Sequence, residues 1–210
     1  VRGTFTPGGT GKSQSQMIKL RYVHLYTRSV DTGTSDSTHM RLNSVYDPVY
    51  GVGGDQPKGF DQYAAMYERY LVHAVSYRVS VTTYSGSSSS VSPAICIVVP
   101  HKSVLTVATA LDDFGHQAEF PNASFGWVTR NEGGDIGAVK AEGYLKLKHL
   151  FGVDKLDIGQ HGAAVGTDPA QEGILNVMIR NQYTGTELYS VMIDLQYYCE
   201  FQGLKNLTDA

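Results

Sequence analysis

The residues with the clearest potential for chemistry form a glycine-rich run at Pro7–Ser13, with the sequence PGGTGKS. A phosphate-binding loop of the GxxxxGKS type places backbone N–H groups and a lysine around the phosphates of a nucleotide. That pattern requires a glycine five residues before Gly11, where this chain has Thr6. It also requires a strand before the loop and a helix after it, whereas a strand is predicted to follow this run. We therefore expect a flexible arm here and not a nucleotide site.

Other catalytic arrangements do not occur in the sequence. The seven histidines are scattered, without the short spacings by which one strand or turn presents two zinc ligands. There is no Gly-x-Ser-x-Gly nucleophile elbow, and Cys96 and Cys199 lie in apolar runs, which favours buried free thiols. Asp112 and Asp113 adjoin a predicted helix end, where capping explains them better than acid/base chemistry. We predict a protein that is not an enzyme and has no cofactor or metal. The remaining calcium candidates, for which loop solvation is the simpler interpretation, are Asp154, Asp157 and Asp168.

Two pairs of basic residues indicate a possible binding surface. Lys19 and Arg21 are separated by one residue in a predicted strand, and so are Lys146 and Lys148 in another. Side chains at positions i and i+2 of a strand project to the same face, so each pair can contact successive phosphates of a nucleic acid. An ordinary solvated sheet face is the alternative interpretation.

Strands must position these residues, because most of the chain alternates apolar and polar residues with a period of two. Leu71–Val81 and Glu187–Phe201 show this alternation over the greatest length. A shift of one residue would expose their whole apolar set, so their register is strongly specified. Four further strands are predicted at Met17–Arg28, Ile95–Val99, Tyr144–Phe151 and Leu175–Ile179.

Only two segments have helical patterns. Phe60–Tyr67 places its aromatic residues on one helical face, and Ser103–Leu111 begins with a residue suited to an N-cap. Seven or eight strands without alternating helices predict a single all-β sandwich. The predicted polar or glycine-rich connections are Asp31–Ser37, Asp47–Pro57, Ser85–Ser90 and Asn131–Gly137.

Composition limits the classes of function. The chain has 210 residues, which suits one good-sized domain, and no linker divides it. Its net charge of −3 excludes a nucleic-acid binder that is basic throughout, with a pI above about 9, and 41% hydrophobic residues exclude a disordered chain. The longest apolar run, Ala94–Val99, is far shorter than the roughly 18 residues that a membrane span needs. Fourteen tyrosines against seven phenylalanines favour surfaces that are partly wet, such as protein interfaces.

A block near the first third of the chain carries a family resemblance. It comprises Asn43–Pro48 and Gln56–Tyr70, and the second part reads QPKGFDQYAAMYERY. This block resembles the capsid proteins of CRESS-DNA viruses (circular Rep-encoding single-stranded DNA viruses), where it leads from a short helix into the second large strand. The segments His149–Val153, Ala163–Pro169 and Leu195–Leu207 are similar to the middle connection and the last strand of that family.

The resemblance implies one eight-stranded jelly-roll β-sandwich with one or two short helices in its loops. A flexible arm would occupy residues 1–16 and the shell domain residues 17–210. Copies of the chain, sixty in the simplest (T=1) shell, would close into an icosahedral capsid around circular single-stranded DNA. The protein would be located in the virion, with assembly in the host nucleus and a host receptor that the sequence does not identify.

Such capsid proteins usually begin with an arm rich in arginine and lysine, but residues 1–16 hold only Arg2 and Lys12. Because phosphate binding depends on the number of basic contacts, three explanations are open. A basic arm precedes Val1, packaging uses few contacts, or the shell forms empty. The basic residues expected on the inner surface are Arg2, Lys12, Lys19, Arg21, Lys146 and Lys148.

Within this resemblance, the aromatic side chains of Phe60, Tyr63 and Tyr67 would anchor the helix onto the sandwich. Arg69 would hold a loop or a neighbouring subunit through charge-assisted hydrogen bonds, for example to Asp47 or Asp61. The predicted structural motif and subunit contact comprises Phe60, Asp61, Gln62, Tyr63, Tyr67 and Arg69. The predicted outer loops are Asp31–Arg41, Val52–Asp55, Ser85–Ser90 and Phe120–Gly137.

The alternative function is a carbohydrate-binding module of the lectin or adhesin type, which would grip a glycan with surface tyrosines and loop carboxylates. It predicts a monomer or small oligomer with an exposed aromatic groove. A hydrolase on a jelly roll is a third possibility, and it lacks a convergent histidine and carboxylate motif.

Overall fold

The computed structural model describes residues 15–51, 55–83, 93–108, 110–128, 138–182 and 185–205. Its strands are β1 (Gln16–Val30), β2 (Ser35–Arg41), β3 (Tyr67–Thr83), β4 (Ala94–His101), β5 (Ser124–Val128), β6 (Val139–Lys146), β7 (Ala163–Ala164), β8 (Ile174–Asn181) and β9 (Glu187–Leu204). Its helices are α1 (Phe60–Met66), α2 (Leu111–His116) and α3 (Leu147–Phe151), and a 3₁₀ turn at Gln117–Glu119 follows α2.

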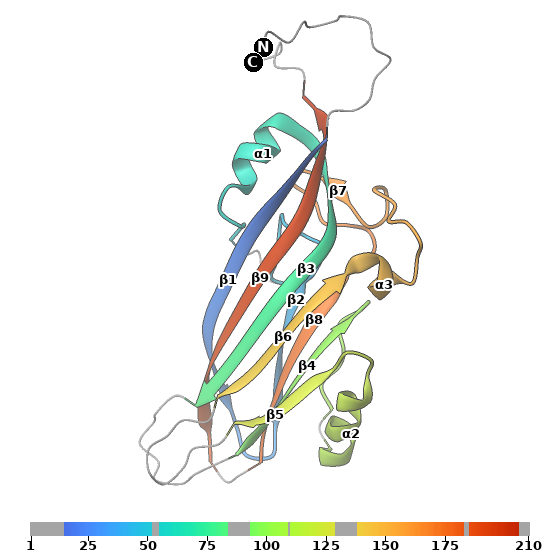
Figure 1. The fold of residues 1–210 in the computed structure, drawn as a ribbon. Helices are drawn as coiled ribbons and strands as arrows, with labels where there is room; N and C mark the ends of the chain where they lie inside the picture. Colours follow the sequence, from blue (N-terminus) through green and yellow to red (C-terminus); the bar gives the residue numbers. More distant parts are fainter. Residues whose placement is uncertain are drawn as a thin grey trace, which may run out of the picture.

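Two antiparallel sheets form the body of the molecule (Figure 1). Sheet A has the strand order β1-β9-β3-β6, with the short β7 beside β3, and sheet B has the order β2-β8-β4-β5. The chain crosses between the sheets after β1, β2, β3, β5, β7 and β8, so most neighbours within a sheet are distant in sequence. This is the jelly-roll arrangement of a β-sandwich, and it confirms the predicted all-β fold.

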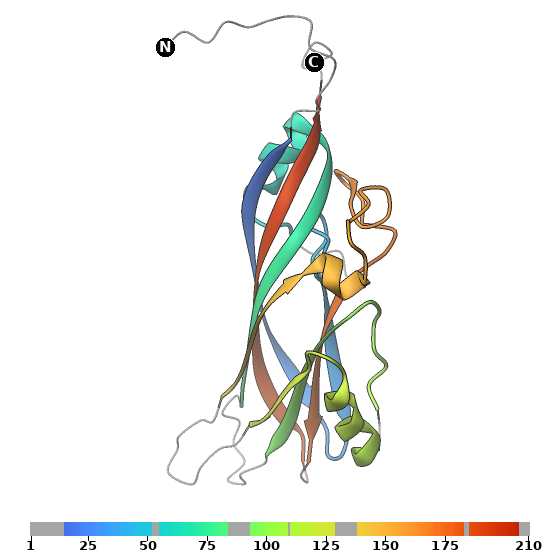
Figure 2. The same ribbon diagram turned by 45° about the vertical axis from the view of Figure 1, so that its right-hand side comes forward.

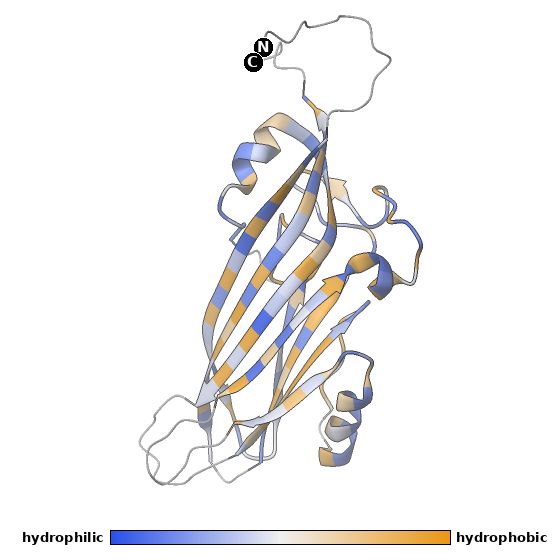
Figure 3. Cartoon of the chain, in the orientation of Figure 1, coloured by the Kyte–Doolittle hydropathy of each residue, from blue (hydrophilic) through white to orange (hydrophobic). Residues whose placement is uncertain are grey.

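The core lies between the two sheets and is set by the period-two alternation of the long strands. In β9 every second side chain, from Tyr189 to Phe201, is fully buried, whereas the residues between them reach the surface. Figure 3 shows the same alternation of apolar and polar residues along β1, β9 and β3. The register of these strands is therefore fixed by burial.

The outer faces of the two sheets differ in how they are covered. All eight residues of β8 are buried, because α2 and the segment before it pack on the outside of sheet B (Figure 2). Phe114 of α2 is fully buried there in a second apolar cluster with Ile97, Val99 and Met178. The outer face of sheet A has no such cover over β1, where alternate residues are exposed. Sheet A therefore presents the accessible face.

Two predicted elements were wrong. Tyr144–Phe151 is not one strand, because β6 ends at Lys146 and α3 follows. Leu147 and Phe151 are both buried and four residues apart, a spacing that suits one helical turn. The predicted helix at Ser103–Leu111 is irregular over residues 103–108, and α2 begins only at Leu111.

Side chains replace helical hydrogen bonds in that irregular segment. Asn176 Oδ1 accepts the Leu105 N–H at 2.9 Å, and Gln117 Nε2 donates to the Thr106 carbonyl at 2.7 Å. The backbone groups are thus satisfied without a helix. The described segments contain three α-helices, where one or two were expected.

Two predicted outer loops contain strands of sheet B instead. Ser35–Arg41 is β2 and Ser124–Val128 is β5. Ser85–Ser90, and residues 52–54 of the loop Val52–Asp55, lie outside the described residues. Within the part of the chain that is described, no helix is long and apolar enough to cross a membrane.

Candidate nucleic-acid interface

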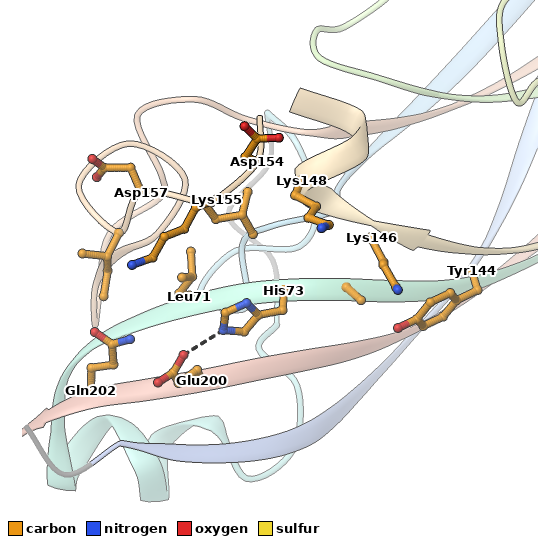
Figure 4. Close-up of a pocket in the computed structure, with 13 residues that line it drawn as sticks. Leu71, His73, Tyr144, Lys146, Lys148, Asp154, Lys155, Asp157, Glu200 and Gln202 are labelled. Carbon is orange, nitrogen blue, oxygen red and sulfur yellow. Dashed lines mark hydrogen bonds and ion pairs between the residues drawn. The ribbon is translucent and has the colours of Figure 1, made fainter. Parts of the chain in front are cut away.

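An open groove of about 860 Å³ lies on the outer face of sheet A, close to the junction of β6 and α3 (Figure 4). Strands β3 and β9 form its floor, and the β6–α3 junction forms one wall. The opposite wall is the loop Asp154–Ile158. Gly152, with a positive φ of 68°, ends α3 in a conformation that other residues rarely adopt, and so directs the chain into this loop.

Three lysines line the groove. Lys146 is the last residue of β6, Lys148 is the second residue of α3, and Lys155 lies in the opposite loop. Within the described residues, none of their ammonium groups takes part in an ion pair or hydrogen bond. Figure 4 shows the carboxylates of Asp154 and Asp157 pointing outward from the loop, away from the floor. The groove therefore presents three lysines that make no direct ion pair among the described residues, although its lining also holds the carboxylates of Asp154, Asp157 and Glu200.

A histidine and a carboxylate occupy the floor. His73 Nε2 and Glu200 Oε2 are 2.8 Å apart, on neighbouring strands β3 and β9. Partial burial acts to raise the pKa of Glu200, but hydrogen bonds from Ser15 and His73 outweigh it and hold this pKa below its usual value. Glu200 is thus ionised at neutral pH, and in the groove it contacts His73 and not one of the wall lysines.

One row of residues crosses sheet A from edge to edge through this site. Lys19 of β1 faces Tyr198 of β9, Tyr198 faces Ala74 of β3, and Ala74 faces Lys146 of β6. Neighbouring strands are about 4.8 Å apart, so the two lysines lie roughly 14 Å apart along the row. The Lys19 ammonium is 5.1 Å from the centre of the Tyr198 ring, a cation–π distance.

Tyrosine rings separate these cations. The rings of Tyr144 and Tyr198 meet edge to face with centroids 5.6 Å apart. Tyr144 remains 57% exposed beside Lys146 and lines the groove. Aromatic faces between lysines are the combination with which proteins hold single-stranded nucleic acid.

Two arginines of this face are paired with carboxylates. Arg21 makes two hydrogen bonds to Asp194, at 2.9 and 2.7 Å, and Arg78 pairs with Glu142 at 2.8 Å. These pairs border a second, smaller groove of about 470 Å³. Positive charge on sheet A is therefore concentrated at the lysines and not spread over every basic residue.

The structure separates the basic residues that the sequence singled out. Lys146 and Lys148 line one groove, although they do not share a strand, and Lys19 lies on the row that leads to it. Arg21 is on the same face but is paired with Asp194. Arg2 and Lys12 lie outside the described residues.

Sequence analysis missed Lys155, Tyr144 and Tyr198 as members of this site. Lys155 comes from a loop, and only the turn after α3 brings it across the groove. Tyr144 shares the alternation of Lys146 and was a detectable signal on its own strand. Tyr198 is fifty-four residues further on, and only the sheet order shows that it lies beside Tyr144.

The family-like block around α1 lies at one end of the sandwich. Phe60 is buried, and its ring contacts those of Tyr70 and Phe201 at 6.0 Å. Tyr63 and Tyr67 also contact the Phe201 ring, at 5.4 and 6.0 Å. The exposed polar residues of this helix are Asp61 and Gln62.

The predicted partner of Arg69 was wrong. Its Nη2 donates to the Ile158 carbonyl at 3.1 Å, which ties β3 to the loop of the groove. Asp47 is paired instead with Arg41, at 3.0 Å. The sequence placed Arg41 in a surface loop, whereas it is the largely buried last residue of β2.

Arg41 gathers three carboxylates at the end of β2. Besides Asp47, its guanidinium contacts Glu172 at 2.5 Å and Asp168 at 3.6 Å. Asp168 also accepts a hydrogen bond from Ser44 at 2.6 Å. The calcium candidate Asp168 is therefore engaged by a cation of the chain itself. No cluster of three or more metal-ligating residues occurs among the described residues.

The two cysteines are buried free thiols, as predicted. Burial raises the pKa of the Cys96 thiol to about 12, and it also raises that of Cys199. Both side chains are therefore protonated at neutral pH. A protonated, inaccessible thiol is a poor nucleophile, which agrees with a structural role.

No protein family and no curated protein matches the sequence. Among solved structures, the chain is similar to one in a semi-empty VLP of giant freshwater prawn Macrobrachium rosenbergii nodavirus, with 13% identity and a TM-score of 0.52 over 98% of this chain and 91% of that one. It is also similar to a chain of Mud crab tombus-like virus, with 14% identity and a TM-score of 0.51 over 96% and 95%. A chain of the 60-mer BFDV capsid protein gives 11% identity and a TM-score of 0.48 over 96% and 100%. The first two likenesses establish a shared fold, and the chain is a jelly roll of the kind found in these two viral structures.

Proposed function

We propose that this chain is a viral capsid protein whose copies close into an icosahedral shell, sixty in the simplest case. The proposal is supported by the jelly-roll topology, by its likeness to the nodavirus and tombus-like virus chains, and by the resemblance of the block around Phe60 to CRESS-DNA virus capsids. Such a protein is structural and not an enzyme. Its place is the virion, with assembly in the host nucleus.

Exposed apolar side chains at both edges of the sandwich carry this proposal. Leu25, on the edge strand β1, is 68% exposed, and Phe125, on the edge strand β5, is 67% exposed. Val23 and Trp127 extend the same two surfaces. Large apolar surfaces on two sides of one molecule are typical of a subunit that is covered by neighbours on both sides.

The proposed cargo is circular single-stranded DNA, and the outer face of sheet A is the surface proposed to meet it. The lysines of the groove support this assignment, because they make no direct ion pair among the described residues and phosphate contacts depend on free cations. Sheet B is less suited, since α2 and its preceding segment cover its outer face.

The carbohydrate-binding alternative is weaker on these observations. It predicted an exposed groove with surface tyrosines and loop carboxylates, and Tyr144, Asp154 and Asp157 do line this groove. The two carboxylates point away from the floor, however, and lysines form the walls (Figure 4). This charge favours an anionic ligand over a neutral glycan.

The mass of the purified particle tests the capsid proposal. Sixty copies of the 22.9 kDa chain weigh about 1.4 MDa, and closed symmetry requires a single size class. We expect light scattering and negative-stain imaging to show that species. A stable monomer or dimer at every salt concentration and pH would overturn the proposal and favour a binding module.

A further inference from the structure

We propose that the groove between β6, α3 and the loop Asp154–Ile158 binds unpaired nucleotides of single-stranded DNA. Lys146, Lys148 and Lys155 would hold the phosphates, and the ring of Tyr144 would stack on a base. The inference rests on the proposed function, which supplies the strand, and it adds the position and the mode of binding.

The charge of the groove selects an anion that runs along it. Lys146 and Lys148 lie on one wall and Lys155 on the other, so a phosphate chain along the groove meets cations from both sides. The two carboxylates near Lys155 point outward, and Glu200 on the floor is engaged by His73 at 2.8 Å. An anion entering here meets three lysines that are not held in ion pairs, while the nearest carboxylate on the floor, Glu200, is in contact with His73.

The choice of lysine also matters. Lysine acts as a point charge, whereas arginine reads guanine or phosphate through a planar pair of donors. The arginines of this face, Arg21 and Arg78, are held by Asp194 and Glu142. The groove is therefore suited to any base sequence, as a protein that packages a whole genome requires.

The aromatic residues distinguish single strands from duplexes. The edge-to-face contact with Tyr198 holds the Tyr144 ring, and most of that ring remains exposed beside Lys146. A base stacks on such a ring only when its own face is open, which is true of an unpaired base and not of a base inside a duplex. Sulfated polysaccharides have the charge for this groove but no base to stack, so they are the competing ligand class.

Oligonucleotide binding by the purified full-length chain tests the inference. The probe is a fluorescein-labelled oligothymidylate, followed by anisotropy over a series of salt concentrations, with a duplex of equal length and a heparin oligosaccharide as competitors. The test variants are Lys146→Gln with Lys148→Gln, and Tyr144→Leu. The control is Lys58→Gln with Lys102→Gln, which removes the same charge from exposed positions outside both the groove and sheet A.

We expect the groove lysine variant to bind oligothymidylate about tenfold more weakly, with the slope of log K against log salt reduced by about 1.4 for two lost phosphate contacts. Tyr144→Leu should also lose about tenfold in affinity, but with an unchanged slope, because stacking releases no counterions. The control variant should stay within twofold of the parent.

Three results would overturn the inference. The first is a control variant that binds oligothymidylate as weakly as the groove lysine variant does. The second is a duplex that binds as tightly as the single strand. The third is an amount of heparin needed to displace oligothymidylate that is the same for Tyr144→Leu as for the parent. Particle mass is measured on each variant in parallel. Shells that form with less nucleic acid leave the capsid proposal intact, whereas failure of the parent chain to form shells overturns that proposal and leaves the groove to be judged on oligonucleotide binding.

Discussion

Arg21 on β1 and Asp194 on β9 form a two-bond ion pair across neighbouring strands, with Nε–Oδ1 2.9 Å and Nη2–Oδ2 2.7 Å. The two residues are 173 positions apart in the chain. The pair turns a residue that the sequence offered as a phosphate contact into a link between strands. Local spacing thus identified the sheet face on which Arg21 lies, but it could not identify the carboxylate that pairs with it.

The acid sensitivity of this pair gives a first prediction. The hydrogen bond from Arg21 lowers the pKa of Asp194 from its ordinary 3.8, and the charges of Arg21 and Arg78 act in the same direction. Partial burial acts to raise this pKa but is outweighed. A lowered pKa means that the carboxylate stabilises the fold above pH 3.8, and that this contribution is lost as the pH falls further. The difference in unfolding free energy between the parent and Asp194→Asn should therefore be largest at neutral pH and shrink below 3.8. A constant difference in urea titrations across that range would contradict the assignment.

The Arg41 cluster gives the largest expected loss of stability. Replacing Arg41 with Gln leaves Asp47, Asp168 and Glu172 together without their shared cation. Removing one partner from a largely buried charge cluster costs about 3 kcal/mol, which urea unfolding would measure. Arg78→Gln breaks an exposed pair and should cost about 0.5 kcal/mol. Equal losses in the free energy of unfolding of the two variants would show that Arg41 stabilises the fold no more than an exposed ion pair does.

Two glycines predict changes of opposite sign on substitution by alanine. A Cβ at Gly162 would lie 2.5 Å from the backbone carbonyl of Tyr70, so β7 would have to move away from β3. We expect Gly162→Ala to lower the free energy of unfolding by about 3 kcal/mol. Gly115, in α2, has open space around it, and Gly115→Ala should stabilise the protein by about 0.5 kcal/mol. Thermal unfolding of the two variants checks both signs.

The single tryptophan provides a probe for assembly. Trp127 and Phe125 project from β5, whose other edge is unpaired within the described sheet, and Trp127 is 54% exposed. Exposed aromatic residues on a free edge strand are expected to be covered in an assembly. Trp127 emission should therefore shift to shorter wavelength as the particle peak grows during assembly. An unchanged emission maximum in complete particles would place β5 outside the subunit contacts.

The cysteines predict a difference in reactivity between the folded and unfolded states. Cys96 and Cys199 are buried, and burial raises both thiol pKa values. Neither thiol should react with a disulfide reagent in the native protein, whereas both should react at once in urea. Mass spectrometry of labelled protein counts the modified thiols in each state, and rapid native labelling would contradict the buried positions.

The sequence predicted strands best where apolar residues occupy every second position over a long segment. The alternation in Glu187–Phe201 predicted almost the whole of β9, because one face of that strand is buried along its length. It failed for β5, where Phe125 and Trp127 face solvent and Gly126 packs against Val139. Hydrophobic character there marks the outside of the molecule, the reverse of the usual rule.

The sequence analysis also missed β2, because most residues of this strand are polar. His39 lies in this strand with its Nδ1 2.9 Å from Asn176 Oδ1 on β8, so its polarity is satisfied within the sheet. The groove has the same dependence on distant partners. Lys146 and Lys148 were visible as a pair, but the opposite wall at Lys155 and the ring of Tyr198 come from other segments of the chain. Spacing along one strand carries no information about those neighbours.

The register of β1 and β9 has a topological consequence. Gln16, at the start of β1, faces Phe201 near the end of β9, and the adjacent Glu200 and Gln202 line the groove. Both ends of the described fold therefore leave the sandwich at the end that carries the groove. In a closed shell, the segments that continue from Gln16 and from Leu204 would leave every subunit at that same end. A cargo peptide attached to either segment would therefore start on the same side of the shell, where it would compete with the genome for space.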